Sequence, residues 1–105
     1  MNINKNKQQI LGLFEQKFQI KSEIIIQKSR ISFKKKGTRF NFFLLFPIKD
    51  GFYLHLNKRF ITSDINRVDF TETNFLNAKL YLQTEIRDKT NALEIIELIS
   101  NVINF

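Results

Sequence analysis

The segment 28–39 contains the side chains whose types and spacing are best suited to chemistry. It holds six cations and no carboxylate within twelve residues. Cations gathered without acidic neighbours favour an anionic partner, and the phosphates of nucleic acid are the strongest case. The predicted nucleic-acid-binding residues are Lys28, Arg30, Lys34, Lys35, Lys36 and Arg39.

The pattern around these cations predicts a β-ribbon. Ile31 and Phe33 alternate with polar residues, which is typical of a half-buried strand. Gly37 marks a turn, and a second strand follows at 39–46. We therefore expect the cations to face outward on one protruding ribbon that lies along a phosphate backbone or enters a groove. Two alternatives stay open: lysines that only prevent edge-to-edge aggregation, and lysines that bind an acidic protein surface.

The remaining polar residues give little support for catalysis. His55 is the only histidine and the chain has no cysteine, so thiolate or histidine-rich metal sites and a cysteine nucleophile are excluded. Asp50 is the carboxylate nearest to His55 that could orient it as a base. Carboxylate-metal nucleases place an acid-x-Lys triplet on a strand, whereas Glu85-Ile86-Arg87 carries arginine instead of lysine. We expect no enzyme, no catalytic residue, no metal and no cofactor.

Length and composition describe one basic globular domain. The chain has 105 residues, a net charge of +7 and 43% hydrophobic residues, which predicts a single domain over 1–105. No apolar run approaches the length of a membrane span, and the first ten residues lack the apolar core of a signal peptide. A cytoplasmic protein without membrane association is the expectation.

Hydrophobic periodicity predicts helices at both ends of the chain and strands between them. A 3.6-residue period predicts helices at 7–18 and from Asp88 or Thr90 to 104, the latter with an apolar stripe that includes Leu93. Strands are predicted at 24–26, 31–34, 39–46, 52–56 and 80–82, with a hairpin turn at 47–51 and a short extended piece around Val68 and Phe70. The fold class is α+β: an antiparallel sheet of four to six strands flanked by N-terminal and C-terminal helices.

The strand at 39–46 is apolar on both faces, which gives a second functional hypothesis. Alternation places Phe40, Phe42, Leu44 and Phe46 on one face, and Asn41, Phe43 and Leu45 on the other. A bare second face would carry an apolar patch, and such patches are usually partner surfaces. The alternative function is therefore a protein-interaction or homodimerisation domain that uses an apolar sheet face made by Phe43, Leu45, Tyr53 and Tyr81.

Two segments also resemble a known family. RFNFFLLFPIKDGFYLHLN and LYLQTEIRDKTNALEIIELISNVI are similar to a small uncharacterised bacterial domain family that often follows nuclease-like modules of restriction and defence proteins. That family resembles the MmcQ/YjbR-like double-wing proteins, which are suspected DNA binders. The resemblance implies DNA binding and no more, and it brings no catalytic residue with it. The N-terminal third has no such match, which leaves open an accessory role in a larger assembly.

Overall fold

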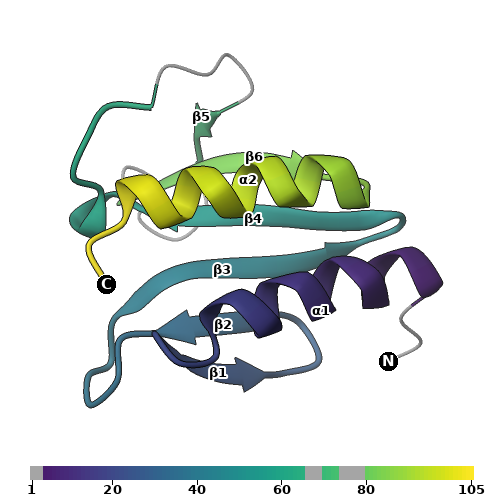
Figure 1. Cartoon of the computed structure of the whole chain (residues 1–105), viewed down its shortest axis with the longest axis horizontal. Helices are drawn as coiled ribbons and strands as arrows, with labels where there is room; N and C mark the ends of the chain where they lie inside the picture. Colours follow the sequence, from purple (N-terminus) through teal and green to yellow (C-terminus); the bar gives the residue numbers. More distant parts are fainter. Residues whose placement is uncertain (1–3, 66–69, 74–79) are drawn as a thin grey trace.

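The computed structural model describes residues 4–65, 70–73 and 80–105, and its architecture is α+β as the sequence predicts. Two helices and one six-stranded antiparallel sheet, in the order β1-β2-β3-β4-β6-β5, make up the described residues (Figure 1). The elements are α1 Lys5–Phe18, β1 Glu23–Ile26, β2 Ile31–Lys34, β3 Asn41–Ile48, β4 Gly51–Asn57, the 3-10 helix η1 Lys58–Phe60, β5 Thr71–Glu72, β6 Tyr81–Ile86 and α2 Lys89–Val102.

Both helices lie side by side on one face of the sheet, α1 over β2 and β3 and α2 over β4 and β6 (Figure 1). Each begins at a side-chain cap: the Asn4 side chain accepts from the Lys7 amide at 2.9 Å, and the Asp88 side chain accepts from the Asn91 amide at 2.7 Å. The start of α2 is therefore set by Asp88, one of the two predicted caps. Within the described residues, neither helix is long and apolar enough to cross a membrane.

The buried face of α2 differs from the predicted stripe. Ile95 is fully buried, whereas Leu93 is 48% exposed. The helix docks through Ala92, Ile95, Ile99 and Val102, which lie on one side of a 3.6-residue period. Leu93 lies to the side of that line, which is why its assignment to the core is wrong.

Both helices cover one continuous core, and its part beneath α1 is a cluster of phenylalanines. Phe14 and Phe18 reach down to Phe43, with ring centroids 5.8 and 5.1 Å apart, and Phe43 stacks on Phe33 at 4.4 Å. The predicted facing of β3 is therefore wrong, because Phe43 and the fully buried Leu45 point to the helices. Alternation separates the two faces of β3 but does not show which of them the helices cover, since both faces are apolar. The register of β2 against β3 shifts between Phe33 and Lys34, at the end of the ladder next to the loop 35–40.

The two hairpin loops of the central strands are built differently. Between β2 and β3 lies the six-residue loop 35–40, in which Gly37 takes the predicted positive φ of 76°. Between β3 and β4 the turn is only Lys49-Asp50, so Pro47 pairs with Phe52 inside the ladder instead of starting the turn. Gly51 is required there, because a Cβ on it would overlap the carbonyl oxygen of Ile86.

The chain after β4 contains an element that the sequence does not predict. The Asn57 side chain accepts from the Arg59 amide at 3.0 Å and starts η1, a single 3-10 turn. The predicted extended piece around Val68 and Phe70 corresponds in part to β5, which begins just after Phe70. Val68 lies outside the described residues.

Candidate nucleic-acid interface

The six predicted cations are divided between the two ends of the sheet. Lys28 and Arg30 lie in the β1–β2 turn, whereas Lys35, Lys36 and Arg39 lie in the loop 35–40 at the other end of β2 (Figure 1). The Gln27 amide donates to the Arg30 carbonyl at 2.9 Å and closes this turn, and β2 begins at Ile31, so neither Lys28 nor Arg30 is a strand residue. The expectation that one ribbon carries all six cations is therefore wrong.

Lys34 belongs fully to neither group. It is the last residue of β2, is half-buried, and lies directly opposite Glu23 of β1 in the ladder. A carboxylate opposite a lysine on neighbouring strands lowers the local positive charge. Of the six predicted residues, Lys34 is therefore the least suited to binding an anionic ligand.

Three segments that are distant in sequence meet at one end of the sheet and form what we call the basic end. They are the turn between α1 and β1, the loop 35–40, and η1 (Figure 1). The basic end comprises Lys21, Lys35, Lys36, Arg39 and Arg59. Sequence reasoning found three of these and missed Lys21 and Arg59, because nothing in the sequence pairs their segments with the loop.

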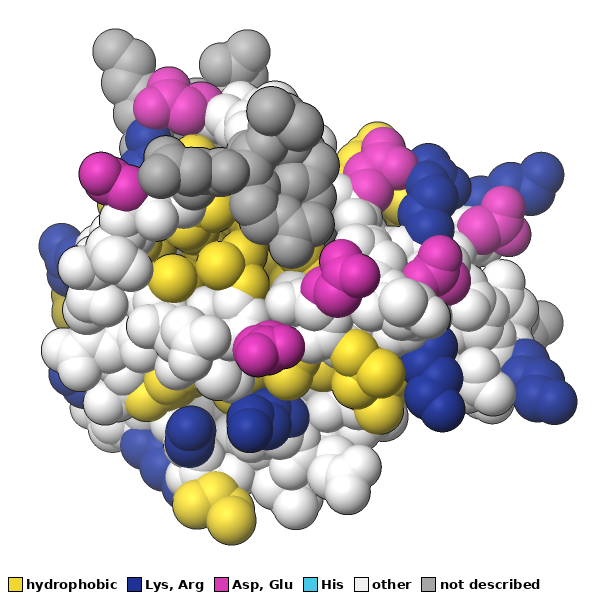
Figure 2. All heavy atoms as spheres, turned by 45° about the horizontal axis from the view of Figure 1, so that its top comes forward, with side chains coloured by type: hydrophobic (Ala, Val, Ile, Leu, Met, Phe, Trp, Pro, Cys, Tyr) yellow, Lys and Arg dark blue, Asp and Glu magenta, His cyan; other side chains and the backbone are white. Residues whose placement is uncertain are grey.

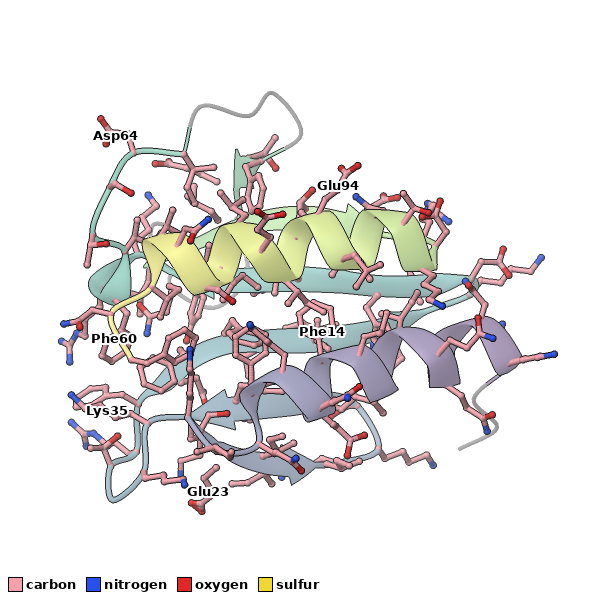
Figure 3. All side chains as sticks on the ribbon, in the orientation of Figure 1. Phe14, Glu23, Lys35, Phe60, Asp64 and Glu94 are labelled. Carbon is pink, nitrogen blue, oxygen red and sulfur yellow. The ribbon has the colours of Figure 1, made fainter. Side chains whose placement is uncertain are left out.

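Reciprocal contacts between cations and rings join the loop 35–40 to η1. Lys35 Nζ lies 5.8 Å from the ring centre of Phe60, and the two side chains point toward each other (Figure 3). In return, the guanidinium carbon of Arg59 lies 4.3 Å from the ring centre of Phe40. Arg39 adds a second guanidinium at 5.6 Å from the Phe40 ring. Each segment thus contributes cations and a ring to the other.

The basic end is also anchored to the core beneath it. The Phe60 ring packs edge-on against Phe42 at 4.9 Å, and Phe42 contacts Phe105 at 4.8 Å. Lys21 Nζ lies 5.4 Å from the Phe105 ring centre. Lys36 Nζ donates to the Ile20 carbonyl at 2.7 Å, which ties the loop to the turn after α1. These contacts hold the cations close together although their charges repel one another.

The basic end has one acidic neighbour in the chain, Glu23, which lies opposite Lys34 in the ladder. Within the described ranges, none of its five cations forms an ion pair, whereas the neighbouring Lys58 pairs with Glu72 at 2.6 Å. The three segments that form the basic end, 19–22, 35–40 and 58–60, contain no Asp or Glu. A potential that is not cancelled by nearby carboxylates is the condition for attracting a polyanion.

The opposite end of the sheet, which we call the mixed end, carries cations with acidic neighbours. It consists of the β1–β2 turn, the β3–β4 turn and the β6–α2 junction, with Lys28, Arg30, Lys49, Arg87 and Lys89 beside Asp50, Glu85 and Asp88. Arg87 Nε binds Glu85 at 2.6 Å, and this hydrogen bond and its charge raise the pKa of Arg87. On the side of the molecule seen in Figure 2, acidic and basic side chains are interspersed toward the right of the view.

The catalytic alternatives find no assembled site among the described residues. His55 is buried in the middle of β4, on the sheet face away from the helices. Its Nε2 shares a 2.8 Å hydrogen bond with Gln83 Oε1. Asp50, the carboxylate considered as its orienting partner, lies instead in the β3–β4 turn. Burial lowers the pKa of His55, and the Gln83 hydrogen bond opposes this. The triplet Glu15-Gln16-Lys17 has acid-x-Lys spacing but lies in α1 and not on a strand. In the part of the chain that the structure describes, no three acidic or histidine side chains gather into a metal site.

The apolar patch expected on the second sheet face does not form as predicted. Phe43 and Leu45 are both fully buried under the helices. Tyr53 and Tyr81 are half-buried. The protein-interaction hypothesis therefore loses the two residues that would have made this face strongly apolar.

The chain was compared with protein-family models, with curated proteins and with solved structures, and none of them matches it.

Proposed function

We propose that this protein is a non-enzymatic nucleic-acid-binding module, or an accessory subunit of a larger assembly, that holds the phosphate backbone through its basic end. The observation that carries the proposal is the convergence of five cations from three segments without an ion pair among the described residues. Clustering like charges opposes folding, and a bound polyanion would offset this cost. The resemblance to the double-wing family points to the same ligand and remains an expectation.

The binding would be mainly electrostatic. The loop 35–40 offers few groups for reading base edges, because Thr38 Oγ1 is engaged with the Lys35 carbonyl and the Phe40 amide. Contacts to phosphate fix position without conveying sequence. We therefore expect high affinity for nucleic acid in general and little preference for any sequence.

Fluorescence anisotropy with a labelled oligonucleotide at several salt concentrations tests the proposal. If all five cations meet phosphates, log K falls against log salt with a slope of about −3.5 for a single strand and about −4.5 for a duplex. Raising the salt from 50 to 200 mM would then weaken binding by roughly 100- to 500-fold. No binding at 50 mM salt, or binding that is insensitive to salt, would refute the proposal.

A further inference from the structure

The basic end contains aromatic rings and arginine guanidinium groups, which are not needed for binding phosphate alone. Arg59 lies over the Phe40 ring at 4.3 Å, and both Arg39 and Arg59 are exposed to solvent. Phe40 and Phe60 are half-buried, and the exposed Arg59 side chain covers the Phe40 ring, so the surface that faces solvent combines the ring with the guanidinium. Aromatic rings and the flat faces of arginine are the two protein surfaces on which unpaired nucleobases stack.

The same region is poorly shaped for the groove of a duplex. The β2–β3 ladder ends at Lys34 and Asn41, and beyond it only the loop 35–40 continues. Lys36 is bound to the Ile20 carbonyl, and Lys35 reaches over to Phe60, so the loop is fastened to the body of the protein on two sides. A ribbon that enters the major groove must instead project freely. In a duplex the base faces are covered by stacking, so a flat surface gains nothing there beyond phosphate contacts.

We infer that the ligand of the basic end is a single-stranded nucleic acid, with one or two unpaired bases stacked on the Phe40–Arg59 surface and the flanking phosphates held by Lys21, Lys35 and Arg39. This inference rests on the proposed function and specifies its substrate class. Lys35 and Arg39 belong to the same loop as Phe40, and Lys21 joins them from the turn between α1 and β1, so a base and its own phosphates can be held together. Each stacked base strengthens binding about 5- to 100-fold.

The test compares one 20-nucleotide strand with the duplex that it forms with its complement, using variants that keep the charge. Arg59→Lys retains the cation and loses the flat guanidinium, and Phe40→Leu retains an apolar side chain and loses the ring. Arg30→Lys and Phe46→Leu are matched controls, because Arg30 lies at the mixed end and Phe46 lies against His55 in the sheet. Circular dichroism and thermal unfolding verify that all four variants fold.

We expect the wild-type protein to bind the single strand more tightly than the duplex. Arg59→Lys and Phe40→Leu should each weaken single-strand binding about tenfold, with the salt slope unchanged and duplex binding unaffected. The inference is overturned if the duplex binds as tightly as the single strand or if the two variants behave like their controls. In that case salt-dependent binding would still support the proposed function, whereas the absence of all binding would refute both.

Discussion

The two ends of the sheet carry similar numbers of cations but differ in whether carboxylates lie beside them. At the mixed end, Arg87 is paired with Glu85 and Asp88 follows it in the chain, while the carbonyls of Asp50 and Arg87 both accept from the Asn6 side chain. At the basic end, the cations lie over phenylalanine rings or against a carbonyl, and none of the five has a carboxylate partner in the described residues. The difference teaches that net charge is a weak guide to function, whereas uncompensated charge held in place by packing is a strong one.

The ends also differ in what holds them together. The mixed end is closed by contacts to backbone carbonyls: Gly51 lies against the Ile86 carbonyl, and the Asn6 side chain donates to the carbonyls of Asp50 at 3.0 Å and Arg87 at 2.8 Å. The basic end is closed by side chains, chiefly the contacts of Phe60 and Phe40 with Lys35 and Arg59. Substitutions at the mixed end should therefore change stability, and those at the basic end should change binding.

Gly51→Ala should have the largest effect on stability. The added Cβ would overlap the Ile86 carbonyl, so β4 and β6 must separate, at a cost of about 1–3 kcal/mol in the free energy of unfolding. Urea unfolding followed by circular dichroism measures this cost. Gly12→Ala is the control. Gly12 lies on the exposed side of α1 and a Cβ there would meet nothing, so this substitution should raise the free energy of unfolding by about 1 kcal/mol. Equal effects of the two substitutions would contradict the packing described at the mixed end.

Asn6→Ala should have the next largest effect. It removes two hydrogen bonds from α1 to the β3–β4 and β6–α2 junctions, each with a net value of about 0.5–1.5 kcal/mol. The midpoint of urea unfolding should fall, while oligonucleotide binding should not change. Gln9→Ala, an exposed position on the same helix, should leave the midpoint in place. If Asn6→Ala lost binding without losing stability, this would contradict the assignment of stability to the mixed end and of binding to the basic end.

Salt should stabilise the free protein slightly through the basic end. Screening weakens the repulsion among its five cations, so the free energy of unfolding should rise by some tenths of a kcal/mol, on the order of one surface charge interaction, between 20 and 200 mM salt. The triple variant Lys35→Gln/Arg39→Gln/Arg59→Gln should show a smaller rise. The same rise in both proteins would mean that the basic end is not under electrostatic strain.

His55, which lies between the two ends, should give the smallest effect, one that depends on pH. Because burial lowers its pKa in the folded state, the unfolded chain binds the proton more readily. The stability that neutral His55 contributes is complete above the ordinary histidine pKa of about 6.5 and is lost as the pH falls toward the lowered value. Urea unfolding at pH 8 and pH 5 should show a larger loss in the wild type than in His55→Gln. An equal loss would assign the pH response to other groups.

Hydrophobic pattern and turn chemistry predicted where the helices and strands lie better than which side of each strand faces the core. The periodicity of α1, the Asp88 cap and the positive φ of Gly37 are local features, and the structure confirms them. The facing of β3 was not predictable, because both of its faces are apolar and alternation alone cannot choose between them. The packing of α1 decided it, because Phe14 and Phe18 contact Phe43, and such tertiary contacts cannot be read from alternation.

The candidate site could be predicted only in part, because some of its residues are neighbours in sequence and others meet only through tertiary contacts. The cations of the loop 35–40 are neighbours in sequence, so their clustering could be read directly. Lys28 and Arg30 were grouped with them because the alternation of Ser32 and Lys34 was extended back to residues that lie in the β1–β2 turn and not in β2. Arg59 joins the loop through its contact with Phe40, 19 positions earlier in the chain, and no pattern in a single sequence reports such a tertiary contact.

The most direct measurement compares two variants that each lose three cations, one at each end. Lys35→Gln/Arg39→Gln/Arg59→Gln removes charge from the basic end, and Lys28→Gln/Arg30→Gln/Lys49→Gln removes the same charge from the mixed end. Titrating both with the same oligonucleotide at 50 mM salt should show at least about a 100-fold loss of affinity for the first variant and only a small loss for the second. Equal losses in the two variants would show that binding follows net charge alone and would contradict the assignment of the basic end as the binding surface.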